Sequence, residues 1–197
     1  MAPMPKSSAK PPHREIILGI DPGSLVTGWG LVEAAGDQLH HISHGTIITT
    51  AAIGLPLRLS RIHHGLREVI ERYQPSMVSL EKVFFSRNVQ SALKLGQARG
   101  VALLAAAERE LGVAEYSAAE IKVAVVGYGQ ATKEQVQRMV NVLLGLRGAI
   151  RADAADALAS AICHAHRRTF QNLVIRSLNG RVKATSWRDY LETASRR

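Results

Sequence analysis

The hydrophobic pattern of this 197-residue chain changes from strand-like to helical spacing near residue 55, and that change limits the folds open to it. Residues 15–21 (EIILGID) form a short apolar run that ends at a Pro-Gly turn. Residues 26–34 and 38–49 also have strand character, and a Gly-Asp turn joins them. Three strands with such short links predict an antiparallel meander at the start of the folded domain.

From residue 55 onward, apolar residues recur at helical spacing and alternate with short strand-like runs. A meander that leads into helix–strand units is typical of an α/β fold, with a mixed five-stranded sheet flanked by helices. The helices are expected at about 55–74, 88–111, 118–126, 132–145 and 152–167, and the two further strands at 77–81 and 113–117.

The two ends of the chain differ from this domain in composition. Residues 1–14 are rich in Pro, Ser, Lys and Ala without periodicity, which indicates a disordered basic arm. Residues 15–168 are expected to form one domain. Residues 169–197 are expected to form a weakly structured basic tail, in which 186–194 could be a short helix.

The formal net charge of +9 indicates a polyanionic partner, but most of it lies in the two ends. Residues 1–14 carry +3 and residues 164–197 carry +6, whereas 15–163 has 14 basic and 14 acidic residues. Within this neutral part, 81–99 and 121–151 are basic. Such segregation can form a basic face that would meet a phosphate backbone, although ordinary solvated helix faces would explain it too.

Composition excludes several classes of protein. No stretch approaches the ~20 apolar residues that a membrane helix needs, and the first residues lack the apolar core of a secretory signal. The single Cys163 excludes an intramolecular disulfide and suits a reducing compartment. We therefore expect a cytoplasmic protein without a membrane partner.

Two acidic residues stand where predicted strands end. Asp21 closes the first apolar run, and Glu81 closes the run at 77–81. Active sites of sheets with this architecture lie at the carboxyl ends of central strands. Each residue also has a structural explanation, because Asp commonly initiates turns and Glu81 could form a surface ion pair with Lys82.

Asp153 and Asp156 lie at the start of the predicted last helix, in the segment RADAADALA. Their i, i+3 spacing puts both carboxylates on one face, with Ser160 further along it, whereas Leu158 and Ile162 would pack inward. The helix dipole favours acids in a first turn. However, no Lys or Arg stands at i+4 to neutralise this pair, so a bound divalent cation is the more specific explanation.

The four acids together predict a metal-dependent nuclease. Carboxylate oxygens without a neighbouring Cys or His cluster select Mg²⁺ or Mn²⁺ over zinc. Two such ions roughly 3.5–4 Å apart can activate a water and stabilise the leaving oxygen of a phosphodiester. The histidines show no zinc-ligand spacing.

Four blocks of the chain, in the same order, resemble the RuvC family of Holliday-junction resolvases. They are ILGIDPGSLVTGWGLVE, SLEKVFFSRNVQSALKLGQARG, YSAAEIKVAVVGYGQATKEQVQRMV and ADAADALASAICH, and they span about residues 15–168. The resemblance implies an RNase H-like fold and a homodimer that cuts two opposed strands of a four-way DNA junction with Mg²⁺. It also implies that Asp21, Glu81, Asp153 and Asp156 are the catalytic carboxylates.

The resemblance implies DNA contacts with less detail. Phe84 matches an aromatic residue that stacks on junction DNA, although Phe85 is adjacent and either could make the contact. Lys122 and Lys133 match basic residues on the phosphate backbone. Arg87, Lys94 and Arg99 are further candidates from the basic segment 81–99. The helix at 88–111 resembles a dimer-forming helix, and the family works with a branch-migration motor of the RuvA and RuvB type.

Three other functions remain open at the level of sequence. An ATP-binding protein of the actin and sugar-kinase type shares the RNase H-like core, but it needs two such cores. A junction-binding module without catalysis would have no use for repelling acids beside DNA. A different RNase H-like nuclease would act on RNA hybrids instead of four-way DNA.

Overall fold

The computed structural model describes residues 14–82 and 89–178 and contains one five-stranded sheet with the order β3-β2-β1-β4-β5. The antiparallel pairs β1–β2 and β2–β3 form the expected meander, and β4 and β5 run parallel to β1. The prediction of a mixed five-stranded sheet is therefore confirmed. The strands are β1 (Arg14–Asp21), β2 (Val26–Ala35), β3 (Gln38–Ile48), β4 (Met77–Glu81) and β5 (Gly112–Tyr116).

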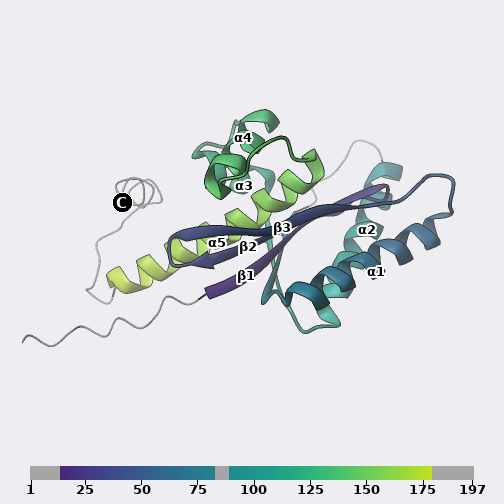
Figure 1. The fold of residues 1–197 in the computed structure, drawn as a ribbon, viewed down its shortest axis with the longest axis horizontal. Coiled ribbons are helices and arrows are strands. Elements are labelled where there is room, and N and C mark those ends of the chain that lie inside the picture. Colours follow the sequence, from purple (N-terminus) through teal and green to yellow (C-terminus); the bar gives the residue numbers. More distant parts are fainter. Residues whose placement is uncertain (1–13, 83–88, 179–197) are drawn as a thin grey trace, which may run out of the picture.

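Helices cover both faces of the sheet (Figure 1). On one face, α1 and α2 enclose a core with Leu18, Leu31 and Leu80, all fully buried. On the other face, α3, α4 and α5 enclose a second core around Ile17, Val32 and other apolar residues. The helices are α1 (Leu55–Tyr73), α2 (Val89–Ala107), α3 (Ala118–Val126), α4 (Lys133–Leu144) and α5 (Ala152–Leu178).

Local signals in the sequence set several helix boundaries. Ser117 and Thr132 cap α3 and α4, each in a capping box with the residue three positions on. Gln74, in the left-handed conformation, ends α1 just before Pro75. These boundaries agree with the sequence-based prediction to within one or two residues.

The expected ends of two helices are wrong. The predicted helix at 88–111 ends at Ala107, because Glu110 adopts a positive φ of 55° and the Leu111 N–H donates to the Ala106 carbonyl. The last helix was expected to end near residue 167, yet α5 continues to Leu178. Thr169 helps to hold this extra part of α5 against the sheet, because its hydroxyl donates a hydrogen bond to the Gly36 carbonyl in the β2–β3 turn at 3.1 Å.

The ends of the chain are only partly described. Arg14 begins β1 and pairs with Glu33, so it does not belong to a disordered arm, and residues 169–178 are helical instead of weakly structured. Residues 1–13, 83–88 and 179–197, with the expected short helix at 186–194, lie outside the described residues. Within the described residues, no helix is both long and apolar enough to cross a membrane.

Candidate active site

The carboxyl ends of β1 and β4 lie side by side in the sheet. Ile20 pairs with Leu80 in parallel register, so the next residues, Asp21 and Glu81, end neighbouring strands at the same edge. The position of both acids at adjacent strand ends agrees with the sequence-based expectation. This edge is where sheets of this architecture bind their ligands.

Two glycines bring the start of α5 onto this edge. Gly28 is the register partner of Asp21, and a Cβ on it would lie only 2.0 Å from the Asp153 carbonyl oxygen. A Cβ on Gly19 would lie 1.9 Å from the Ala157 carbonyl oxygen. The backbone of α5 therefore rests directly on β1 and β2, which only glycine permits at such close approach. Asp153 is thereby placed beside the end of β1, and Figure 1 shows the start of α5 at this end of the sheet.

Hydrogen bonds fix the loop that follows Asp21. The buried Thr27 hydroxyl donates to the Gly23 carbonyl at 2.8 Å and accepts from the Gly23 N–H at 3.3 Å. The Thr49 hydroxyl donates to the Ser24 carbonyl at 2.8 Å. The turn is thus tied to β2 and to the end of β3, which gives the Asp21 carboxylate a defined position.

A buried polar bridge joins β4 to α5 close behind the acids. The Ser79 hydroxyl lies 2.8 Å from both the carbonyl and the hydroxyl oxygen of Ser160, and both residues are buried. Ser79 precedes Glu81 by two residues and Ser160 follows Asp156 by one helical turn. The expectation that Ser160 shares the face of the acids is therefore consistent with the structure, in which that face turns toward β4.

The four acids interact electrostatically. Burial, and after it the negative charges of Asp156, Asp153 and Glu81, together raise the pKa of Asp21 to about 7. Partial burial of the carboxyl group, and after it the charge of Asp156, also raise the pKa of Glu81, although the residue as a whole is exposed. The Asp21 carboxyl group is therefore expected to exchange its proton near neutral pH.

A lysine from another helix partly compensates this negative charge. The Lys133 ammonium nitrogen lies 2.6 Å from Asp156 Oδ2. This hydrogen bond, followed by the charges of the acids, raises the pKa of Lys133. Lys133 and Lys122 in turn oppose the upward pKa shift of Glu81. The sequence has no Lys or Arg at i+4 from Asp153 or Asp156. The neutralising residue comes from α4 instead.

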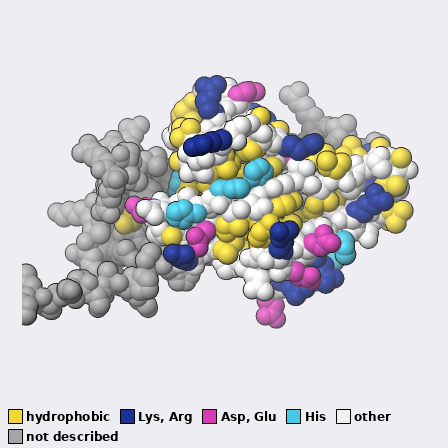
Figure 2. All heavy atoms as spheres, viewed as in Figure 1, with side chains coloured by type: hydrophobic (Ala, Val, Ile, Leu, Met, Phe, Trp, Pro, Cys, Tyr) yellow, Lys and Arg dark blue, Asp and Glu magenta, His cyan; other side chains and the backbone are white. Residues whose placement is uncertain are grey.

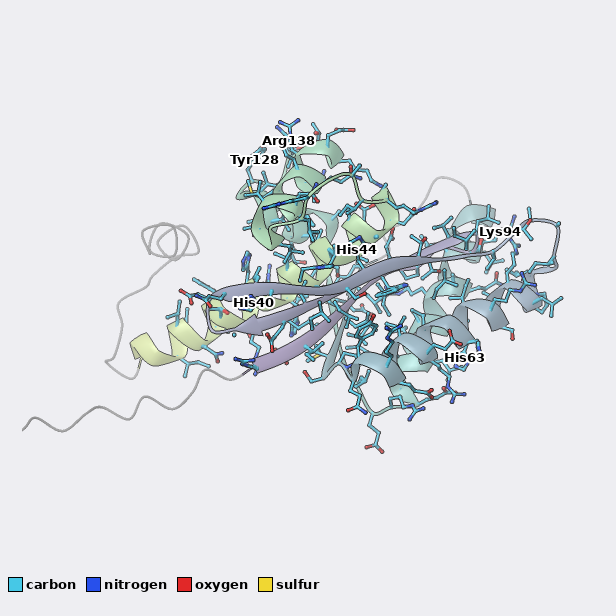
Figure 3. The ribbon with its side chains drawn as sticks, in the orientation of Figure 1. His40, His44, His63, Lys94, Tyr128 and Arg138 are labelled. Atoms are coloured by element: carbon cyan, nitrogen blue, oxygen red, sulfur yellow. The ribbon has the colours of Figure 1, made fainter. Side chains whose placement is uncertain are left out.

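The other predicted DNA-contact residues differ in their surroundings. Arg99 reaches inward from α2 to Glu115 and to the Glu81 carbonyl oxygen. Lys94 is exposed on α2 (Figure 3). Phe84 and Arg87 lie outside the described residues.

Basic side chains do not gather into one surface on the face that Figure 2 shows. There, Lys and Arg are spread over helices on both sides of the sheet, with Asp and Glu between them. Histidines occur along β3, where His41 Nε2 and His44 Nδ1 lie 2.8 Å apart, and His63 stands separately on α1 (Figure 3). The clearest candidate site is therefore the acidic end of the sheet.

Comparison with known proteins identifies the family. The sequence profile of the family described as crossover junction endodeoxyribonuclease RuvC matches residues 17–164, which include all four acids. The chain belongs to the RuvC family. Relatives with this description occur in Pelobacter propionicus, 51% identical over 88% of this chain and 98% of theirs, and in Syntrophotalea carbinolica, 55% identical over 76% and 93%.

Solved structures agree with this assignment. RuvC of Thermus thermophilus, in complex with a Holliday junction substrate, matches with a TM-score of 0.76 and 35% identity over 80% of this chain and 96% of that one. The yeast mitochondrial Holliday junction resolvase Ydc2 shares the fold, with a TM-score of 0.60 at 14% identity. The RNase H-like fold expected from the resemblance is thus confirmed.

The donor set of this RuvC-family site suits a hard divalent cation. Its acids come from β1, β4 and α5, and their oxygens are the ligands that Mg²⁺ and Mn²⁺ prefer. In the described part of the chain, no three His, Cys, Asp or Glu side chains are yet gathered closely enough to hold an ion as they stand. The raised pKa of Asp21 and the ammonium of Lys133 on Asp156 both indicate that the cluster needs positive charge.

Proposed function

We propose that this chain is a structure-selective DNA endonuclease that resolves four-way (Holliday) junctions by paired, symmetric strand cuts in recombination and repair. The observation that carries this proposal is the meeting of Asp21, Glu81 and the start of α5 at one end of the sheet, in a chain of the RuvC family. The T. thermophilus relative supports the choice of substrate, because its structure contains a Holliday junction.

In this proposal, Asp21, Glu81, Asp153 and Asp156 hold two Mg²⁺ ions, for which Mn²⁺ can substitute. When bound, such ions supply an activated water and stabilise the leaving oxygen of the phosphodiester, which gives 5′-phosphate and 3′-hydroxyl ends. Asp21 must ionise to serve as a ligand, so cation binding is expected to weaken as the pH falls below its pKa. Lys133 orients the Asp156 carboxylate through their hydrogen bond.

The DNA is held mainly through its phosphates. Lys122 and Lys133 flank the acids, and Lys94 is exposed on α2. Each of these lysines can contact the phosphate backbone of a junction arm. Phe84 and Arg87 are the further proposed contacts. Phosphate contacts carry no sequence information, and binding through them should weaken steeply as salt rises.

The active form is proposed to be a homodimer in the cytoplasm that works with a branch-migration motor. Two sites related by a two-fold axis would match the approximate symmetry of a junction. One exposed stripe of α2 supports this. Leu93 and Leu104 are 63% and 52% exposed, and within the described residues a Cβ placed on Gly96 or Gly100 between them would contact nothing beyond its own helix. A second copy could approach closely along this stripe.

Gly100→Leu is expected to convert the dimer into a monomer with little loss of folding stability. The substitution removes a helix glycine at a position where an added Cβ contacts no other part of the described chain, but the larger side chain would block a close helix contact. Sedimentation equilibrium should show the loss of dimer, with Ser60→Leu on the exposed face of α1 as the matched control. An undiminished dimer would place the interface elsewhere.

The function itself is tested by a comparison of substrates. With Mg²⁺, purified protein should cut a synthetic four-way DNA junction at least about tenfold faster than a linear duplex or an RNA–DNA hybrid of the same sequence. Faster cutting of the hybrid would favour an RNase H-like ribonuclease. Junction binding without cutting in either Mg²⁺ or Mn²⁺ would favour a binding module.

A further inference from the structure

Arg99 occupies an unusual position for a residue expected to contact DNA. Its side chain, only 14% exposed, extends from α2 toward the ends of β4 and β5. Its Nη1 donates to the Glu81 backbone carbonyl at 2.8 Å, while its Nη2 forms an ion pair with the Glu115 carboxylate. One guanidinium therefore joins three elements of the fold.

The bond to Glu81 lies where the pairing of β4 stops. Glu81 is the last residue of β4, and one further bond, from the Lys82 N–H to the Tyr116 carbonyl at 2.7 Å, connects this end to β5. The direction of the Glu81 side chain depends on its backbone at this point. A charged, planar donor can hold a carbonyl and a carboxylate at once, which an ordinary ladder bond cannot do.

The position of Arg99 on α2 is itself well defined. Its neighbours Ala98 and Ala102 are fully buried, and their small side chains let α2 pack closely in the core under the sheet. A Cβ added at Gly96 or Gly100 would contact no other element among the described residues, so this side of α2 faces away from the core. Arg99 thus connects a helix that is anchored on one side and exposed on the other to the strand end that carries Glu81.

We propose that Arg99 is a positioning residue that fixes the backbone of Glu81, and with it the Glu81 carboxylate, instead of a contact to DNA. The proposal rests on the proposed function of the acidic site. It also provides a route by which movement of α2, for example when its exposed stripe is covered, would reach the active site. Glu115 has a supporting role, since its carboxylate holds the second arm of the guanidinium.

Arg99→Met tests this role, because it keeps most of the side-chain volume and removes every donor. The rate of junction cleavage at saturating enzyme should fall by roughly 10- to 100-fold, as small displacements of a catalytic group do. The Mg²⁺ concentration for half-maximal rate should rise several-fold. Junction affinity in Ca²⁺ and its dependence on salt should stay within about threefold of the unsubstituted protein.

Matched variants separate positioning from general destabilisation. Arg109→Met removes an arginine from the ion pair with Glu71, away from the site, and should leave the cleavage rate near its original value. Arg99→Lys should recover part of the rate, because one ammonium can still reach the Glu81 carbonyl. If Arg99→Met melts too readily to assay, Arg99→Lys and Glu115→Gln carry the test, with smaller losses of rate expected at unchanged affinity.

The opposite pattern would overturn the proposal. If Arg99 contacts DNA, Arg99→Met should bind the junction more weakly, and its cleavage rate at saturating enzyme should be unchanged. The slope of log affinity against log salt concentration should then be smaller by about one. An unchanged cleavage rate and an unchanged Mg²⁺ requirement in Arg99→Met would also contradict the positioning role. The proposed function would still stand in that case if the original chain cleaves the junction. A chain that cuts no junction before any substitution would instead contradict the proposed function on which this role rests.

Discussion

Asp21→Asn should abolish junction cleavage in Mg²⁺ while junction binding in Ca²⁺ persists. The change keeps the shape of the side chain but removes a negative ligand at the edge where β1, β4 and α5 meet. Loss of several kcal/mol of transition-state stabilisation corresponds to a rate at least about a thousandfold lower. Single-turnover cleavage of a labelled junction measures the rate, and gel-shift titration in Ca²⁺ measures the affinity.

Asp37→Asn provides the matched control for this substitution. Asp37 is an exposed acid in the β2–β3 turn, and its replacement removes the same charge from the chain without touching the acidic site. It should cleave at nearly the original rate. Retained cleavage by Asp21→Asn would contradict the assignment of the active site, and loss of binding would show that Asp21 supports the fold or the DNA interface instead.

Asp21→Asn is also expected to stabilise the folded protein in the absence of divalent cations. Asp21 has a pKa of about 7 in the folded chain, compared with an ordinary value of 3.8. A raised acid pKa means that the folded state binds the proton more tightly, so the wild-type chain loses stability as pH rises from about 4 to 7. Above pH 7 the full penalty, on the order of 4 kcal/mol, should be present in the original chain and absent from Asp21→Asn.

Denaturant unfolding in EDTA at several pH values measures this effect. At pH 8 the variant should be more stable by a few kcal/mol, and the gain should shrink on acidification and vanish near pH 4. At pH 8 the melting temperature of the variant should be higher by roughly 10 °C for a chain of this size. A gain that is independent of pH, or no gain at all, would contradict the conclusion that Asp21 is charged at a cost to folding.

The strands and the four acids were predictable from sequence because their signals are local. Apolar runs of strand length marked β1 and β4, so the positions of Asp21 and Glu81 at strand ends could be predicted. The i, i+3 spacing of Asp153 and Asp156 marked a shared helix face. The helix starts at α3 and α4 could be predicted for the same reason, since capping residues act within one turn.

The contacts that shape the site could not be predicted, because they join elements far apart in the chain. Lys133 meets Asp156 only because α4 packs against α5. Arg99 counted as a free basic residue in the sequence, yet its guanidinium is held by the ends of β4 and β5. The length of α5 was also missed, because its last turns are supported in part by the contact of Thr169 with a distant turn.

If the acidic end of the sheet resolves four-way DNA, both cuts on one junction can be mapped. Each of the four strands is labelled in turn at its 5′ end and incubated with the protein and Mg²⁺. We expect cuts in two opposed strands at symmetry-related positions, with nicked duplex products that a DNA ligase seals without further processing. Cuts confined to one strand, or ends that the ligase cannot join, would contradict this expectation.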